Sequence, residues 1–247
     1  MSIDIEITQR DFELFKMLNR LKFLRVDLVN GFFFSGKRTT SKRRCQQRLK
    51  LLTDNDYLIR VKGGLSTQFI YRLSRKGVRY LENEWYRFHP NQSDGESKKK
   101  FKAFPFIESM PWSSFFHEHE VARVLNEFWH GKFRAFYSDR ELKRMYKDYA
   151  IIPDLLIKTT KGNIAVEVEL ESKTHKRIRE KLKTYSEIEG ISYVLYLCNG
   201  IGIQQAVGGI AHQIGTLNFG LQVMQLDGFH REPQVVFNQI KTTLKGS

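Results

Sequence analysis

The sequence predicts a two-domain protein of the α+β class: a helical N-terminal part with a hairpin, and a C-terminal part with a central mixed sheet flanked by helices. Three observations support this prediction. The chain has 247 residues, more than a typical single domain. Residues 88–105 are polar, turn-rich and charged, as linkers are. Helical patterns precede a hairpin in residues 1–87, whereas strands alternate with helices in 106–247.

The N-terminal part has the element order of a winged helix-turn-helix. Thr8 and Asp11 mark the start of a first helix, because a hydroxyl caps the helix and an acid suits its first turn. A second apolar segment covers residues 26–34, and a third helix follows the caps at 39–41. A hairpin is expected over residues 57–73. Three helices before a hairpin predict a winged helix whose third helix enters the major groove.

The third helix is strongly basic, which favours DNA as the partner. The formal net charge of the whole chain is +14, and the segment from Lys37 to Lys50 contains no acid. Arginine can contact guanine or phosphate, and glutamine can contact adenine. A solvated basic face is the alternative. The predicted DNA-binding residues here are Lys37, Arg38, Lys42, Arg43, Arg44, Gln47 and Arg48.

The sequence argues against a membrane or secreted protein. No run of eighteen apolar residues is present, so no membrane insertion is expected. The first residues are acidic and polar, unlike a secretory signal. Cys45 and Cys198 fall in different predicted domains and lack metal-ligand spacing. The predicted location is the cytoplasm.

Residues 151–185 contain the densest set of candidate site residues. Pro153-Asp154 precede an apolar strand, and a second strand from Ile164 to Leu170 follows a turn. Glu167 and Glu169 point to the face opposite the apolar one, about 7 Å apart at the usual rise of a strand. A hairpin brings Asp154 alongside them. Three presented carboxylates beside a lysine-rich helix predict a site for Mg²⁺ or Mn²⁺.

The helix expected from Ser172 onward has two stripes. Ile178, Leu182 and Ile188 form its predicted buried stripe. A second stripe at i, i+4 spacing holds Lys173, Arg177, Lys181 and Tyr185. It can hold a scissile phosphate beside the carboxylates, with Arg177 as a further DNA-binding residue. A solvent-facing basic surface is the alternative.

The P-D pair, the hairpin and E-x-E on the next strand resemble the PD-(D/E)XK nuclease superfamily, which has a restriction-endonuclease-like fold. More narrowly, PD…EVEL…S…R…KL…Y behind a winged helix resembles the plasmid replication-relaxation proteins, which include MobC-type mobilisation relaxases. The resemblance covers most of the chain and implies that Asp154 and Glu167 bind a divalent cation, with Glu169 as a further ligand. Glu169 stands where the superfamily has its lysine. The catalytic lysine is then Lys173 or Lys181, or the site is not a standard nuclease site.

Residues 117–120, His-Glu-His-Glu, begin another predicted helix. Two histidines at i and i+2 face away from each other on a helix, which argues against a two-histidine metal site. The replication-relaxation proteins commonly have a histidine at the start of this helix, and His119 matches it best. Glu120 is a candidate further metal ligand, as in some of these nucleases.

The expected function is therefore that of a plasmid mobilisation relaxase, a metal-dependent endonuclease that binds a transfer-origin sequence and nicks one strand. Other mobilisation or relaxosome proteins are expected partners. One alternative is a non-catalytic DNA-binding accessory protein with a decayed nuclease fold, and another is an endonuclease that cuts both strands. Tyr185 is the candidate if the enzyme forms a covalent DNA link, although a free 5′ phosphate is the expected product.

Overall fold

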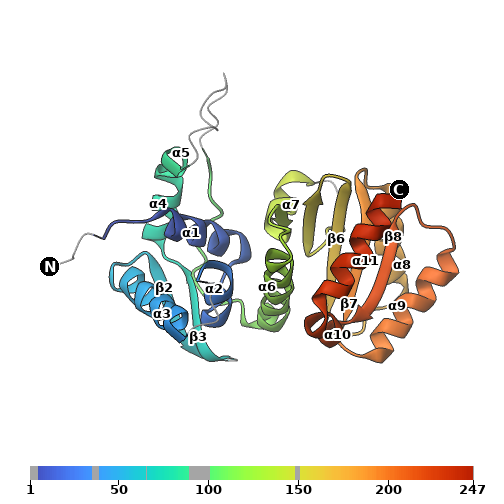
Figure 1. Ribbon diagram of the computed structural model, residues 1–247, viewed down its shortest axis with the longest axis horizontal. Coiled ribbons are helices and arrows are strands. Elements are labelled where there is room, and N and C mark those ends of the chain that lie inside the picture. Colours follow the sequence, from blue (N-terminus) through green and yellow to red (C-terminus); the bar gives the residue numbers. More distant parts are fainter. Residues whose placement is uncertain (1–4, 35–38, 65, 89–100, 148–150, 247) are drawn as a thin grey trace, which may run out of the picture. The chain divides into compact units, whose positions relative to one another are not determined.

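A computed structural model describes residues 5–34, 39–64, 66–88, 101–147 and 151–246 (Figure 1). The chain divides into two compact units, Met1–Ala122 and Arg123–Ser247. Each unit has its own sheet, so the chain is of the mixed α+β class. No helix in the described ranges is both long and apolar enough to cross a membrane.

The N-terminal unit contains the predicted three helices and hairpin. A three-stranded antiparallel sheet has the order β1-β3-β2. The predicted cap is present, since the Thr8 side chain and the Asp11 side chain form a capping box at the start of α1. The elements are α1 (Gln9–Leu21), β1 (Leu24–Arg25), α2 (Val26–Phe33), α3 (Thr39–Asp54), β2 (Leu58–Gly63), β3 (Ser66–Leu73), α4 (Arg75–Asn83) and α5 (Trp85–Phe88).

The division between the units lies inside α6 (Phe115–His130), beyond the linker predicted at 88–105. Residues at the end of this segment and beyond it belong to the core of the N-terminal unit. Phe104 is buried, and its backbone exchanges two hydrogen bonds with the Asn19 side chain, at 2.9 and 3.0 Å. Met110 is buried with Phe23 and Ile70. Such long-range packing has no periodic signature, so the composition of this segment does not reveal that the unit continues beyond it.

The C-terminal unit is built on a five-stranded mixed sheet with the order β4-β5-β6-β7-β8. The first three strands pair antiparallel, and β6, β7 and β8 pair parallel. Its elements are β4 (Phe136–Ser138), α7 (Asp139–Met145), β5 (Leu155–Thr159), β6 (Gly162–Glu169), α8 (His175–Glu187), β7 (Ile191–Cys198), α9 (Ile201–Ile214), β8 (Gly220–Gln225), α10 (Leu226–Arg231) and α11 (Pro233–Gly246).

Both faces of this sheet are covered by helices (Figure 1). Side chains of α8 and α9, including Ile178 and Val207, pack with Ala165 and Tyr196. Helices α10 and α11 lie against β7 on the other face. The alternation predicted for β6 is correct, but the expectation that its acidic face is presented to solvent is wrong. That face lies under α8, so its two glutamates are buried.

The turn between β5 and β6 depends on a glycine. Gly162 has a φ of +112°, and a Cβ there would overlap with Ser192 Oγ. We expect Gly162→Ala to lower the free energy of unfolding by about 2–3 kcal/mol, from backbone strain and this clash. Denaturant unfolding measures the change. The control is Gly208→Ala in α9, where an added Cβ meets no atom within 4 Å. It should stabilise the protein by up to about 1 kcal/mol, and equal effects at the two sites would contradict the prediction.

Candidate active site and nucleic-acid interface

Glu167 on β6 is the centre of a buried polar cluster. Its side chain is 1% exposed. The Tyr185 hydroxyl donates a hydrogen bond to Oε1, and the Lys181 ammonium donates one to Oε2. Burial raises the pKa of Glu167 to about 7, because the adjacent Lys181 offsets only part of the desolvation and the charge of Asp154 adds to it. This carboxyl therefore changes its charge near neutral pH.

Asp154 lies beside this cluster, at the start of β5. Its Oδ2 accepts a hydrogen bond from the backbone N–H of Val168, at 2.9 Å. The hairpin thus brings Asp154 to the end of β6 that carries Glu167, and the two carboxylates are close enough for Asp154 to raise the pKa of Glu167. Asp154 is half-buried and, unlike Glu167, lines an open cleft.

Glu169 is engaged in a separate set of contacts. Its Oε1 lies 3.4 Å from Lys173 Nζ, and its Oε2 accepts a 3.4 Å hydrogen bond from the Tyr196 hydroxyl. The prediction of three convergent carboxylates is therefore not met. In the described part of the chain, no group of three or more His, Cys, Asp or Glu side chains is arranged to hold a metal. Glu120 belongs to the N-terminal unit, where its charge helps to raise the pKa of Arg25 after the larger effect of Asp27.

Asp154 and Glu167 have the oxygen-donor chemistry that Mg²⁺ and Mn²⁺ prefer. Magnesium commonly takes one or two carboxylates from a protein and completes its shell with water and phosphate oxygens. Asp154 lines the open cleft and Glu167 lies buried beside it, so the pair offers the two carboxylates that such a shell takes from a protein. Glu169 stands apart from this pair, because its contacts are with Lys173 and Tyr196.

The cleft beside Asp154 has a volume of about 770 Å³. Cations from two helices line it: Lys143 on α7, and Lys176, Arg177 and Lys181 on α8. Helix α8 begins here because the Thr174 side chain caps it and accepts from the backbone N–H of Arg177. Arg177 and Lys181 thus lie where the sequence placed them. Lys143 was not predicted, since only the fold brings α7 beside α8.

Tyr185 does not have the surroundings of a nucleophile. Its ring is fully buried among the apolar side chains of α8 and the sheet. Burial and the neighbouring Glu167 raise the pKa of Tyr185 well above its ordinary value, so the hydroxyl stays protonated. It takes the place in the buried stripe that the sequence assigned to Ile188, which is only partly buried at the end of α8. The hydroxyl donates its hydrogen bond to Glu167, and these surroundings disfavour a role as nucleophile.

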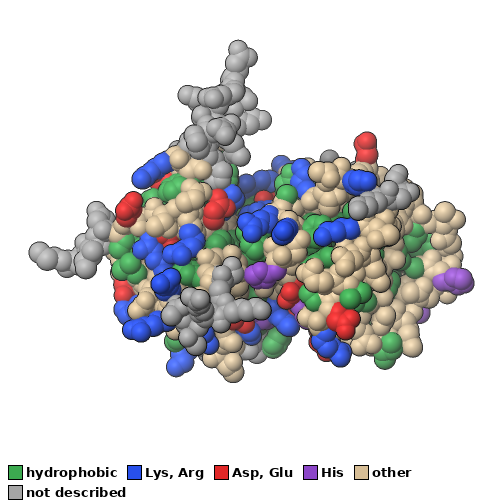
Figure 2. All heavy atoms as spheres, viewed as in Figure 1, with side chains coloured by type: hydrophobic (Ala, Val, Ile, Leu, Met, Phe, Trp, Pro, Cys, Tyr) green, Lys and Arg blue, Asp and Glu red, His purple; other side chains and the backbone are tan. Residues whose placement is uncertain are grey.

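The predicted DNA-binding residues of the third helix lie mostly on the exposed side of α3. Cys45, Leu49 and Leu52 are buried, which turns the opposite side of α3 outward. Figure 2 shows Lys and Arg side chains gathered over the region that α3 occupies in Figure 1. The exposed predicted residues are Lys42, Arg43, Arg44 and Gln47.

A groove of about 340 Å³ separates α3 from the β2–β3 hairpin. Lys42 and Gln46 line it on the helix side, and Lys62 and Gln68 line it on the hairpin side. These are donors suited to phosphate and base-edge contacts. Lys37 and Arg38 lie outside the described residues.

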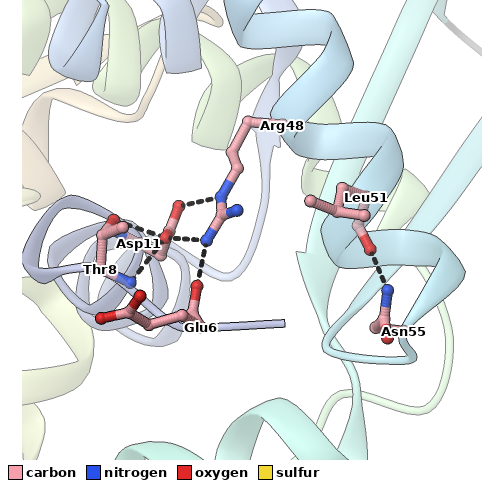
Figure 3. A network of polar contacts seen from close by, with 6 residues as sticks. All are labelled: Glu6, Thr8, Asp11, Arg48, Leu51 and Asn55. Atoms are coloured by element: carbon pink, nitrogen blue, oxygen red, sulfur yellow. Dashed lines mark hydrogen bonds and ion pairs between the residues drawn. The ribbon is translucent and has the colours of Figure 1, made fainter. Parts of the chain in front are cut away.

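Arg48 is the exception among the predicted DNA-binding residues (Figure 3). Its Nε lies 3.0 Å from Asp11 Oδ1, and one terminal nitrogen lies 2.5 Å from Oδ2 and 2.7 Å from the carbonyl oxygen of Glu6. The arginine therefore joins α3 to the N-terminus of α1. No local pattern indicates this role, because Arg48 and Asp11 lie 37 residues apart.

The histidine predicted near the start of α6 lies in a hydrophobic core. His119 is buried, and its ring stacks on Phe115 with centroids 6.0 Å apart. His117 is partly buried. Within the described ranges, neither histidine belongs to a group of three or more potential metal-ligating side chains.

Comparison with known proteins identifies one family. A family model described as replication-relaxation matches residues 15–195. No curated protein and no solved structure gives a significant match to the chain. The matched region takes in the α3 helix, the β5–β6 hairpin and all of α8, and it spans well over half of the chain. The chain therefore belongs to the replication-relaxation family.

Proposed function

We propose that this protein is a plasmid mobilisation relaxase that binds a transfer-origin sequence and nicks one strand hydrolytically. One observation carries the proposal: in a member of the replication-relaxation family, Asp154 and Lys181 line an open, cation-rich cleft, and Lys181 is paired with the buried Glu167 beside it. The helix and hairpin order supports a winged helix-turn-helix, and the mixed sheet with its P-D hairpin supports a PD-(D/E)XK domain. Other mobilisation proteins are the natural partners of such an activity.

The side chains have distinct roles in this proposal. Asp154 and Glu167 hold Mg²⁺ or Mn²⁺, which supplies activation of water and polarisation of the phosphate when it is bound. The Lys181 ammonium stabilises the negative charge that develops on the phosphate. Arg177 and Lys143 contact flanking phosphates along the cleft. Water adds to phosphorus while the 3′ oxygen leaves, so the products are a 5′ phosphate and a 3′ hydroxyl.

A plasmid assay tests the proposal. Purified protein is incubated with a supercoiled plasmid carrying its native origin, with Mg²⁺ or Mn²⁺. We expect open circles from the parent protein and none from the Asp154→Ala, Glu167→Ala double variant. Linear product would favour an endonuclease that cuts both strands. Binding without cleavage at either metal would favour the accessory protein with a decayed site.

The α3 surface gives a separate prediction about binding. Replacing Lys42, Arg43 and Arg44 together with alanine should weaken duplex binding at least about tenfold. The salt slope, which is the slope of the logarithm of the binding constant against the logarithm of the salt concentration, should become shallower by up to about 3, because each cation that binds a phosphate contributes about one. Fluorescence anisotropy over a range of salt concentrations measures both quantities. Lys241→Ala, an exposed site on α11, serves as the control. An unchanged salt slope in the triple variant would exclude α3 as the contact surface.

A further inference from the structure

We propose that the Lys181 ammonium and a divalent cation compete for the carboxylate of Glu167, so that binding of the cation releases Lys181 into the cleft. The inference rests on the proposed function in one respect: Asp154 and Glu167 are taken as the ligands. It adds a step that the ligand assignment alone does not contain, because it makes the position of the lysine depend on the cation.

The first support is the occupancy of the Glu167 oxygens. Tyr185 holds Oε1, and Lys181 holds Oε2. The tyrosine is a fully buried, rigid partner that packs in the core. Lys181 has a flexible stem and lines the open cleft. A cation that approaches from the cleft therefore meets the oxygen that the lysine already uses.

The second support is the charge around Lys181. Lys181 is paired with Glu167, and Asp154 lines the same cleft as this lysine. The ammonium thus serves as the common counter-ion of these carboxylates. A divalent cation bound by Asp154 and Glu167 would neutralise the same carboxylates and repel the ammonium at close range. The two positive groups cannot both be held tightly at this place.

The third support is the cation-lined cleft that a released Lys181 side chain would enter. Arg177 lies one helical turn before Lys181, and both line the same cleft. A released ammonium would join this cation where a DNA phosphate has to lie. The cation would therefore complete the ligand set and free the lysine for the phosphate in a single exchange.

Chemical labelling tests the exchange without measuring cleavage. The full-length protein is treated with an amine-acetylating reagent at constant pH, with Mg²⁺ or with a chelator, and acetylation at each lysine is quantified by mass spectrometry. We expect Mg²⁺ to increase acetylation of Lys181 several-fold, because an ammonium released from Glu167 is open to the reagent in the cleft. Lys183, an exposed residue of the same helix, is the internal control and should not respond.

Two further measurements decide the result. Calorimetry establishes the Mg²⁺ concentration that saturates the protein, and Asp154→Asn is expected to abolish the response of Lys181 to Mg²⁺. Equal acetylation of Lys181 with and without saturating Mg²⁺ would overturn the exchange, and so would a failure of Mg²⁺ to bind. A Lys181 response without plasmid nicking would retain the exchange and remove the nuclease proposal. Nicking without a Lys181 response would do the reverse.

Discussion

The Lys181→Met variant is expected to lose about 3–5 kcal/mol of unfolding free energy at pH 9, because it leaves the buried Glu167 carboxylate without its counter-ion. Methionine retains most of the packing of the lysine stem, so the loss reports on charge. Tyr185 continues to donate one hydrogen bond to Glu167, but a neutral donor does not replace the ammonium.

This loss should depend on pH in a defined direction. Glu167 has a folded pKa of about 7, above its ordinary value of 4.5, so its protonated form is the one that folding favours. Below pH 7 the carboxyl is largely neutral, and removal of Lys181 should cost only about 1–2 kcal/mol. As pH rises through 7 the parent protein ionises Glu167 beside Lys181, whereas the variant must bury the charge alone. The difference therefore grows with pH, by up to about 1.4 kcal/mol per unit.

Urea unfolding of the parent and the variant at pH 6 and pH 9 measures this difference. Glu167→Gln in the Lys181→Met background should restore much of the loss at pH 9, because it removes the uncompensated charge. The matched control is Lys183→Met, on an exposed position of α8, which should change stability by less than about 0.5 kcal/mol. A loss that is the same at both pH values would show that Lys181 acts through packing.

The second large effect is expected at the ion pair between α1 and α3. Arg48→Met should lower the free energy of unfolding by about 3–5 kcal/mol, because Asp11 is 1% exposed and would lose its charged partner. Burial raises the pKa of Asp11, but hydrogen bonds from Arg48 and Thr8 outweigh it, and the pKa lies below 3.8. The pair therefore stabilises the protein above the unfolded pKa, and its contribution is lost as pH falls through the folded pKa.

Thermal and urea unfolding at pH 7 without DNA measure the effect of Arg48→Met. Lys50→Ala, which removes an exposed i,i+4 pair with Asp54 on the same helix, is the control and should change stability by less than about 0.5 kcal/mol. If Arg48→Met kept full stability and lost only DNA affinity, Arg48 would be a DNA contact and the structural role would be wrong.

Local patterns predicted the elements and faces well where the relevant contacts are near in sequence. The Thr8–Asp11 capping box follows from three-residue spacing. The alternation of β6 placed Glu167 and Glu169 on one face, and i+4 spacing placed Lys181 and Tyr185 on one side of α8. These rules depend only on backbone geometry.

Sequence periodicity does not predict which other element packs on each face of a strand or helix. Alternating acids on a strand usually indicate solvent, but α8 crosses this face and buries Glu167 with two donors. Arg48 resembles any other cation of a basic helix until the fold brings Asp11 to it. Lys143 joins the cleft because α7 and α8 become neighbours. Each of these outcomes depends on tertiary packing, which periodicity does not encode.

The contacts of Glu167 have a consequence for how this domain folds and evolves. Asp154 contacts Val168 across 14 residues, and Lys181 and Tyr185 contact Glu167 across 14 and 18. Closing loops of this length carries a modest entropy cost, which grows only slowly with length. One supersecondary unit, β5–β6–α8, therefore contains the complete cluster at low sequence separation. Insertions in the loops that flank this unit leave its register intact, so the candidate chemistry can be inherited as a single contiguous block while the rest of the chain diverges.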